Sequence, residues 1–385
     1  MGLNKKKAII ILTEWYLPGR KAGGPVKSIE SLVCEMKDYF DFYILTTNTD
    51  LGELTPYKNI DIDQWISQND GSKIYYLDKY KLSKNNILKA LRSVPFEYMY
   101  INSLYSKWFS VLPLRLYQNK KISCQIVLAP RGMLSSGALK IKSFKKKSFI
   151  FISRLIGLHN HIKWHATSKI EEVEIKKHFG MDASVTIIEN FSKPLNRFSR
   201  DIIKKPGYLK LFFLSRVTKV KNLHIAIESL CAFNKTQYNI VYDIYGNLED
   251  VSYYKKCISL IKNLGSNIKV EFKGELKNEN IFEVIKNYHF LFLPTSNENF
   301  GHSIIESLQC GVPVIISNKT PWRNLHEHGC GWDLEPLPEF FKDSLEFAIN
   351  MNDVDYSKMS EKSLAFVELV SNSSKKRKHY FELFS

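Results

Sequence analysis

Long apolar runs and closely spaced cysteines are both missing from this sequence of 385 residues. No run approaches the roughly 18 consecutive apolar residues of a transmembrane helix, which argues against a membrane bundle. None of the six cysteines forms a C-x-x-C pair, so we expect buried thiols in a reducing compartment rather than disulfides or a zinc site. They stand at Cys34, Cys124, Cys231, Cys257, Cys310 and Cys330.

Acidic residues are missing from residues 101–150, which contain ten Lys and Arg. The net charge of +16 is equally uneven: residues 1–195 hold 30 basic and 17 acidic side chains, a net +13, and the remainder 25 and 22, a net +3. This excess indicates an anionic surface or partner for the amino-terminal half. Within it, Lys140–Ile152 (KIKSFKKKSFIFI) could lie on anionic lipid, or could equally be a solvated helix face whose Phe residues reach the core.

The order of the secondary structure predicts an α/β protein of two domains. Short apolar runs alternate with helical patterns such as Val26–Tyr39 and Lys169–Phe179, which favours doubly wound parallel sheets. Asn190–Tyr208 is rich in Lys, Arg, Pro and Ser and is predicted to be the linker, with domains at residues 1–195 and 196–365. The predicted strands are Ala8–Leu12, Phe42–Thr46, Lys73–Leu77, Tyr98–Asn102, Gln125–Ala129, Lys163–Thr167, Val185–Glu189, Leu209–Leu214, Ile240–Tyr245, Lys269–Phe272, Phe290–Leu293 and Val314–Ser317.

The stretch Pro294–Ser317 combines two carboxylates, a glycine turn and a helix start after a buried strand. A helix predicted from about His302 would present its amino-terminal N–H groups to an anion at the carboxyl edge of the sheet. Glu298 lies in the loop before that helix, and Glu306 lies in its second turn. A sugar phosphate suits this combination, with its phosphate on the N–H groups and its hydroxyls on the carboxylates.

Other candidate residues follow strands that end at the same kind of edge. Arg216 and Lys221 come after the first strand of the second domain, from where cations reach a bound diphosphate. The glycine-rich turn Pro18–Lys27 follows the first strand of the chain; alone it indicates a tight turn more often than a phosphate site. Arg131 in APRGML could meet a phosphate or could be a solvated loop arginine.

These motifs resemble the retaining GT-B glycosyltransferases of family 4. The resemblance rests on E-x7-E from Glu298 to Glu306, on SRVTKVKNL with Arg216 and Lys221, on the GRKAGGPVKS loop, and on WHATSKIEE from Trp164. It implies the α/β GT-B fold, two Rossmann-like domains facing across a cleft, with the last helix, about residues 366–385, joining the first domain.

The resemblance also implies roles for these residues. Arg216 and Lys221 would stabilise the leaving diphosphate without a metal, and Glu298 would contact the donor sugar; these three are the predicted catalytic residues. The donor-binding residues would be Glu306, which holds the ribose hydroxyls, the Phe300-Gly301-His302 turn, and Gly23 and Gly24 from the first domain. No cofactor is implied beyond a UDP- or GDP-sugar as the donor substrate.

One departure concerns the acceptor side. Many relatives carry a histidine in the amino-domain loop where this sequence has Arg131. The predicted acceptor-side residues are Arg131, Lys27 and His165, and a general base stays unassigned. A front-face transfer with retention, in which the departing phosphate oxygen takes the acceptor proton, needs no such base.

The function expected from the resemblance is transfer of a hexose-type sugar to a growing lipid-linked surface polysaccharide, such as an O-antigen, capsule or exopolysaccharide. The partners would be a nucleotide sugar, a polyprenyl-diphosphate-linked glycan and an anionic membrane, with the enzyme peripheral at the cytoplasmic face of the plasma membrane. One alternative is a soluble transferase on a small acceptor such as a sugar phosphate. The other is a non-catalytic basic nucleic-acid-binding protein, although the sequence lacks an aromatic-rich nucleic-acid motif.

Overall fold

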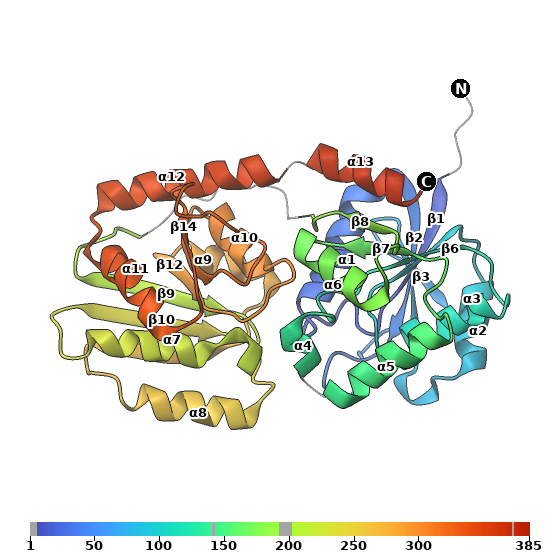
Figure 1. Cartoon of the computed structure of the whole chain (residues 1–385), viewed down its shortest axis with the longest axis horizontal. Coiled ribbons are helices and arrows are strands. Elements are labelled where there is room, and N and C mark those ends of the chain that lie inside the picture. Colours follow the sequence, from blue (N-terminus) through green and yellow to red (C-terminus); the bar gives the residue numbers. More distant parts are fainter. Residues whose placement is uncertain (1–5, 141–142, 192–201, 372) are drawn as a thin grey trace. The chain divides into compact units, whose positions relative to one another are not determined.

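The computed structural model describes residues 6–140, 143–191, 202–371 and 373–385. It divides the chain into two compact units, Met1–Phe191 with Ser373–Ser385, and Ser192–Asn372 (Figure 1). Part of the predicted linker, residues 192–201, and part of the basic segment, residues 141–142, lie outside the described residues. Each unit is built around one sheet and is described by itself below.

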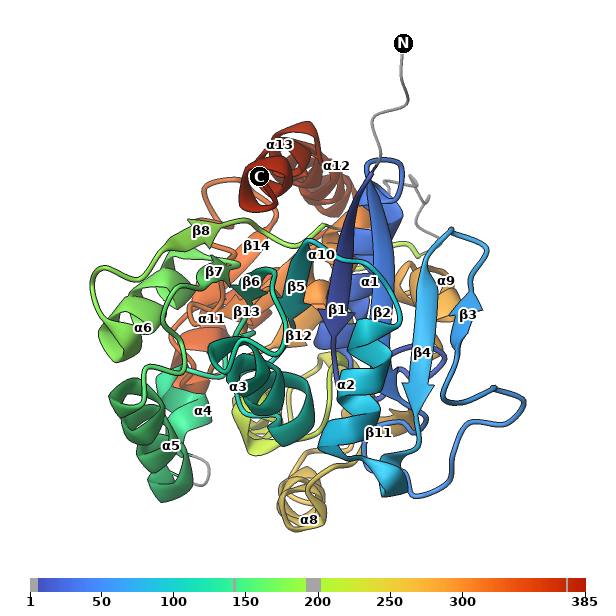
Figure 2. The same ribbon diagram turned by 90° about the vertical axis from the view of Figure 1, so that its right-hand side faces the viewer.

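The amino-terminal unit contains an eight-stranded sheet in the order β3-β4-β2-β1-β5-β6-β7-β8, which can be followed across Figure 2. All neighbours are parallel except β3, which pairs antiparallel with β4 at one edge. The seven predicted strands are present, and the short edge strand β3 was not predicted. The strands are β1 (Lys7–Leu12), β2 (Phe40–Thr47), β3 (Trp65–Ser67), β4 (Lys73–Leu77), β5 (Tyr98–Ile101), β6 (Gln125–Leu128), β7 (Lys163–Ala166) and β8 (Val185–Ile187).

Helices cover both faces of this sheet. Side chains alternate along a strand, so Ile9 and Ile11 of β1 pack on one face while Ile10 and Leu12 pack on the other. One face is covered by α1 (Gly24–Met36) and α13 (Ser373–Leu383), and the other by α2 (Lys84–Arg92), α3 (Leu112–Gln118), α5 (Ser143–Leu155) and α6 (Lys169–Phe179). The short α4 (Ser136–Lys140) precedes α5. Burial on both faces explains why these strands are almost continuously apolar.

The last helix of the chain, α13, belongs to the amino-terminal unit. Its residues Tyr380 and Leu383, followed by Phe384, complete the core beside α1. Arg377 forms an ion pair with Glu35 of α1 at 2.9 Å. The last helix was predicted at about residues 366–385, and α13 lies within this range; the helix before it, α12 (Asp353–Val370), is part of the carboxy-terminal unit.

The carboxy-terminal unit has a six-stranded, fully parallel sheet in the order β11-β10-β9-β12-β13-β14. The first strand lies in the middle, and the strand order reverses between β9 and β12, as in Rossmann folds. The strands are β9 (Tyr208–Leu214), β10 (Asn239–Tyr245), β11 (Ile268–Gly274), β12 (Phe290–Leu293), β13 (Val314–Ser317) and β14 (Gly331–Leu334), and the helices are α7 (Leu223–Leu230), α8 (Val251–Ile261), α9 (Ile281–Ile285), α10 (His302–Gln309), α11 (Pro338–Asn350) and α12. Only β14 was not predicted, because it carries just two large apolar residues, Trp332 and Leu334.

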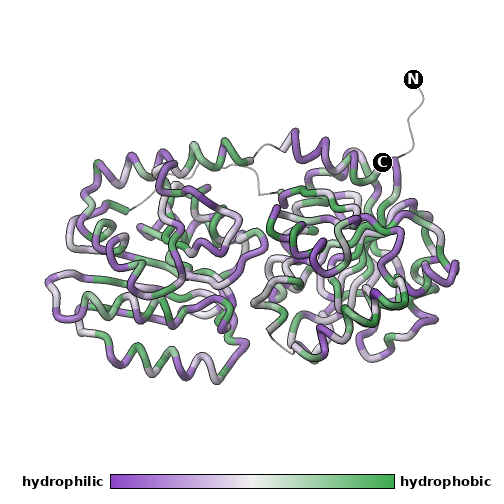
Figure 3. Tube along the Cα trace, viewed as in Figure 1, coloured by the Kyte–Doolittle hydropathy of each residue, from purple (hydrophilic) through white to green (hydrophobic). Residues whose placement is uncertain are grey.

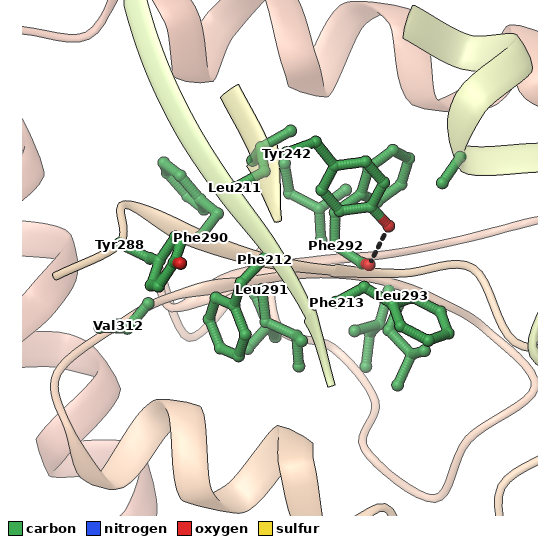
Figure 4. Packing of buried hydrophobic residues seen from close by; sticks show 14 of the residues in the cluster. Leu211, Phe212, Phe213, Tyr242, Tyr288, Phe290, Leu291, Phe292, Leu293 and Val312 are labelled. Carbon is green, nitrogen blue, oxygen red and sulfur yellow. Dashed lines mark hydrogen bonds between the residues drawn. The ribbon is translucent and has the colours of Figure 1, made fainter. Parts of the chain in front are cut away.

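The core of this unit is centred on β9 and β12. Figure 4 shows Phe212 and Phe213 of β9 beside Phe290 and Phe292 of β12, all buried. The Tyr242 hydroxyl donates a hydrogen bond to the Phe292 carbonyl oxygen at 2.9 Å, so its polar end is satisfied within the core. The hydrophobic positions of the chain gather at the strands in the centre of each unit (Figure 3).

The sequence has no C-x-x-C pair and no long apolar run, from which free thiols and the absence of a transmembrane helix were predicted. All six cysteines are free thiols, and three of them, Cys257, Cys310 and Cys330, are buried. Among the described residues, no helix combines the length and the apolar character needed to cross a bilayer.

Candidate functional site

The candidate site of the carboxy-terminal unit lies at the carboxyl ends of β9 and β12. These two strands are neighbours in the sheet, and the chain order reverses between them. The loop after β9, residues 215–222, and the loop after β12, residues 294–301, therefore leave the sheet side by side. Open parallel sheets bind ligands at this switch point, just outside the carboxyl ends of the strands.

The two loops are hydrogen-bonded to each other. The Ser296 amide donates to the Val220 carbonyl oxygen at 2.8 Å, and the Asn222 side-chain amide donates to the Pro294 carbonyl oxygen at 3.0 Å. Asn222 adopts the left-handed conformation, φ 53° and ψ 35°, which asparagine tolerates better than most residues. These contacts fix the position of Lys221, which lies between Val220 and Asn222.

Lys221 and Glu298 form an ion pair across the two loops. Both side chains are only 12% exposed, so solvent screens this pair less than a surface pair. The Glu298 amide also donates to the Lys319 carbonyl oxygen at 3.0 Å, which ties its loop to the segment after β13. Two residues predicted independently, 77 positions apart, are thus in contact at the predicted edge of the sheet.

The start of α10 lies next to this pair in the chain. Gly301 has φ 79°, a left-handed conformation that favours glycine. The N-cap residue Gly301 has no side chain with which to cap this helix start. The Phe300 ring is buried against Trp322, whose indole N–H donates to the Phe300 carbonyl oxygen. The predicted donor contact of the Phe300-Gly301-His302 turn is therefore one through the backbone.

Glu306 lies in the second turn of α10, as the helical spacing predicts. It is 3% exposed, so it is more deeply covered than Glu298. The structure confirms one carboxylate in the loop and one on the helix. The role of Glu306 as the residue that binds the ribose stays a prediction.

Arg216 has a different environment from Lys221. Its guanidinium is exposed and lies 3.0 Å from both carboxylate oxygens of Glu249, in the loop after β10. An exposed pair of this kind contributes little to stability and leaves the arginine free to exchange partners. The structure brings Arg216 to the same edge of the sheet but pairs it with Glu249 rather than with Glu298.

Three residues of this site were missed by sequence reasoning. They are Asn222, Gly246 and Trp322. Gly246 has φ 147°, and a Cβ atom there would lie 1.8 Å from the Ser215 carbonyl oxygen, so this glycine lets the loop after β10 approach the loop carrying Arg216. A glycine directly after a strand was an available signal; for Trp322, which contacts Phe300 from 22 residues away, the local sequence carries none.

The glycine-rich turn of the amino-terminal unit is organised by Asp50. The Asp50 carboxylate accepts hydrogen bonds from the amides of Arg20, at 2.8 Å, and Lys21, at 3.1 Å. Gly23 has φ 67° and ψ −116° and precedes α1, in whose first turn Lys27 lies. This backbone conformation requires a glycine at Gly23. The Arg20 and Lys21 amides already donate to the Asp50 carboxylate, so they are occupied by an anion of the protein itself. Phosphate contacts at Gly23 and Gly24 stay a prediction.

Arg131 is held by the protein itself. It adopts φ 54°, and its guanidinium donates at 2.7 Å to each of three partners, Asn102 Oδ1, Asn190 Oδ1 and the Tyr100 hydroxyl. The arginine therefore joins the segments that follow β5, β6 and β8. It is not the solvated loop arginine considered above, and an acceptor-side role would require it to leave these partners.

His165 is a core residue of β7. Its Nε2 lies 2.8 Å from the Ile188 carbonyl oxygen, which can only accept, so Nε2 carries the proton and Nδ1 accepts from the Tyr100 hydroxyl at 2.6 Å. Burial, together with the Arg131 charge, lowers the pKa of His165 to about 3. An acceptor-side base needs a nitrogen that substrate can reach, so the prediction for His165 does not fit this environment.

The lowered pKa of His165 predicts acid sensitivity of the fold. The pKa of this histidine is 6.5 in the unfolded chain and about 3 in the folded chain. Between these two pH values the unfolded chain binds a proton at His165 and the folded chain does not, so the free energy of unfolding decreases as pH falls. At pH 5 the loss should be about 2 kcal/mol for this group. Urea unfolding at pH 7 and pH 5 measures it: His165→Gln should start less stable but show a weaker pH dependence, whereas the exposed His328→Gln should keep the original slope. An unchanged slope in His165→Gln would contradict the assignment.

Over the described ranges 6–140, 143–191, 202–371 and 373–385, no group of three or more His, Cys, Asp or Glu side chains is placed to hold a metal ion.

Residues 196–363 match the family model described as glycosyl transferases group 1. This range contains both loops of the candidate site. None of the curated proteins matches the chain.

Solved structures resemble the chain over nearly its full length. Sucrose-phosphate synthase from Thermosynechococcus elongatus has a TM-score of 0.74 at 14% identity, covering 98% of this chain and 99% of that one. HepE from Anabaena, in complex with UDP and glucose, has a TM-score of 0.69 at 14% identity with the same coverage. WaaG, a glycosyltransferase involved in lipopolysaccharide biosynthesis, has a TM-score of 0.60 at 13% identity, covering 96% of this chain and 98% of that one. At these identities the likeness establishes the fold.

Proposed function

We propose that this chain is a glycosyltransferase that transfers a hexose-type sugar from a UDP- or GDP-sugar to a growing lipid-linked surface polysaccharide. The proposal is supported by the match of residues 196–363 to the model of the group 1 glycosyl transferases and by the GT-B fold. The observation that carries the proposal is the Lys221–Glu298 ion pair at the switch point of the carboxy-terminal sheet. A cation and a carboxylate held together at this point match the two ends of a nucleotide sugar. HepE, which shares the fold, was solved with UDP and glucose.

The roles of the residues follow from their positions. Lys221 binds the diphosphate, and Arg216 joins it by exchanging Glu249 for phosphate oxygens, since its present pair is exposed. Glu298 accepts hydrogen bonds from the hydroxyls of the donor sugar, and Glu306 from those of the ribose. The start of α10 at Gly301 favours negative charge, because the helix dipole is positive at its amino-terminal end.

The transfer itself needs charge stabilisation above all. The bond between the anomeric carbon and the phosphate oxygen breaks, and the acceptor oxygen forms its bond on the same face of the sugar, so the configuration is retained. The departing phosphate oxygen takes the acceptor proton. Lys221 and Arg216 stabilise the negative charge that develops on the diphosphate, so the step is proposed to be independent of a metal.

The acceptor is proposed to be a polyprenyl-diphosphate-linked glycan at the cytoplasmic face of the plasma membrane. The support is the charge distribution, because residues 101–150 hold ten basic and no acidic side chains. A peripheral enzyme with such a surface is attracted to anionic lipid and to the diphosphate of the acceptor.

A soluble transferase acting on a sugar phosphate is a second candidate. It is supported by two neighbours of the same fold, sucrose-phosphate synthase and a trehalose-6-phosphate synthase that covers 99% of each chain with a TM-score of 0.67 at 8% identity. An extract of polyprenyl-linked glycan and a set of hexose phosphates, offered with the same donor, separate the two candidates by which one is glycosylated.

The donor can be identified with the purified chain and a panel of UDP- and GDP-sugars. The matching donor should raise the melting temperature, because a ligand at one hundred times its Kd stabilises the folded state by about 2.7 kcal/mol. The same donor should be hydrolysed slowly when no acceptor is present. If no nucleotide sugar of the panel changes the melting temperature or is hydrolysed, the proposed function is wrong.

A further inference from the structure

Helix α5 of the amino-terminal unit exposes a stripe of large apolar side chains. Phe144, Phe151 and Leu155 are 85%, 69% and 77% exposed, and their spacings of seven and four residues put them on one side of the helix. The neighbouring Ile152 and Ile156 are exposed as well. Figure 2 shows α5 at the periphery of its unit. Single exposed apolar residues are common, but a stripe along a whole helix indicates a binding surface.

The opposite side of α5 holds the helix firmly on the unit. Ile150 and Ser153 are buried, and the Phe149 ring packs edge-on against Tyr105. Lys146 reaches inward, where its ammonium group donates to the Ala138 carbonyl oxygen at 2.6 Å. The orientation of α5 is therefore fixed, and its apolar stripe faces away from the core. The sequence also allowed a solvated helix face whose Phe residues reach the core. Of the Phe residues of α5, only Phe149 packs inward in this way.

Positive charges border the stripe. Lys145, Lys147 and Arg154 are exposed on the same outer side of α5. Asp and Glu are absent from residues 98–170, which surround this helix in the sequence, although they contain 13 Lys and Arg. A soluble protein partner would be expected to meet a mixture of charges, whereas an anionic lipid surface meets only cations and apolar side chains.

We propose that α5 lies in the interface of an anionic lipid bilayer, with Phe144, Phe151 and Leu155 among the acyl chains and Lys145, Lys147 and Arg154 at the headgroups. The helix thereby docks the amino-terminal unit on the membrane. The inference rests on the proposed function only in that the acceptor is lipid-linked; the docking surface itself is defined by α5 alone. Because charge attraction contributes beside apolar insertion, the binding should weaken as salt is added.

Co-sedimentation of the full chain with vesicles tests the proposal. The chain should bind vesicles of phosphatidylcholine mixed with phosphatidylglycerol more tightly than vesicles of phosphatidylcholine alone. Binding should weaken with salt, because the Debye length falls from about 10 Å at 0.1 M to about 3 Å at 1 M. Combining Phe144→Ser, Phe151→Ser and Leu155→Ser should lower the affinity on the order of tenfold or more. Replacing Lys145, Lys147 and Arg154 by Gln should lower it about fivefold for each charge.

Matched controls come from α11, which exposes Phe340 and Phe347 next to acidic side chains. Phe340→Ser combined with Phe347→Ser should leave vesicle binding unchanged. The α5 variants replace exposed residues, so their melting temperatures should match that of the original chain.

Full vesicle binding by the α5 serine variant would overturn the proposal, as would equal binding to neutral vesicles. A change in its solution mass without a change in vesicle binding would assign the stripe to a second copy of the chain instead. Hydrolysis of the donor without vesicles should be unaffected by these variants, so failure of the docking and failure of the proposed transfer are distinguishable.

Discussion

Replacing Lys221 with alanine is expected to lower kcat/KM for sugar transfer by about 10²- to 10³-fold, the usual cost of removing one charge-stabilising group from a transition state. Lys221 is the most covered cation of the candidate site, and its ammonium group is held against Glu298 between two fixed loops. Little protein reorganisation is then needed when charge develops on the leaving diphosphate. Lys221→Arg should restore only part of the rate, because the position holds one ammonium group in contact with one carboxylate.

Steady-state kinetics with the matching donor measure this effect. Lys219→Ala is the matched control, since Lys219 lies on the same short 3₁₀ helix, Lys219–Lys221, but is exposed. Glu298→Gln should also lower the rate, and the double variant should lose less than the sum of the two single losses, because the residues are in contact. If Lys221→Ala transfers sugar at the original rate, the assignment of the site to these loops is wrong.

Replacing Gly246 with alanine is expected to destabilise the carboxy-terminal unit by about 3 kcal/mol or more, within the range of severe single substitutions. The new Cβ atom would lie 1.8 Å from the Ser215 carbonyl oxygen, and φ 147° is unfavourable for any residue with a side chain. Backbone has to move to relieve this contact. The loop that moves carries Arg216, so donor affinity should fall together with stability.

Urea unfolding and donor-induced stabilisation test this expectation together. Gly207→Ala is the control, because Gly207 has φ 83° in the same unit, just before β9, but a Cβ atom there meets nothing within 4 Å. Its cost should be only the conformational strain, about 1–2 kcal/mol, with donor affinity retained. Equal destabilisation by the two substitutions would show that strain, and not the close approach to Ser215, determines the role of Gly246.

Most of the fold could be read from the sequence, because buried parallel strands are short, apolar and bounded by polar loops. Lys73–Leu77, Phe290–Leu293 and Val314–Ser317 were predicted to the residue, as was the helix Lys169–Phe179. The two strands that were missed, β3 and β14, lie at the edges of their sheets. These two edge strands are also short, with two large apolar side chains each, whereas the other edge strands, β8 and β11, were predicted.

The candidate site was predicted in its residues but not in its contacts. Glu298 and Lys221 were assigned separately, from a motif and from a position after a strand, and their ion pair appears only when β9 and β12 become neighbours. Arg131 and His165 show the reverse. Arg131 was considered as a phosphate contact or a solvated loop residue, and His165 as a weaker acceptor-side candidate, because a histidine in a strand is more often structural. Each is occupied by partners that come from β5 and from the segment after β8.

The sequence by itself determined the two α/β series, the E-x7-E loop with its helix start, and the excess of positive charge before residue 195. These features depend on neighbours in the chain, whose periodicity and spacing are visible in a string of letters. Only the tertiary structure decided that Lys221 is paired with Glu298, that Arg131 is bound inside its own unit, and that α5 turns Phe144, Phe151 and Leu155 outward. Each of these depends on which distant segments lie next to a side chain, and sheet order and helix orientation settle that only once the chain has folded.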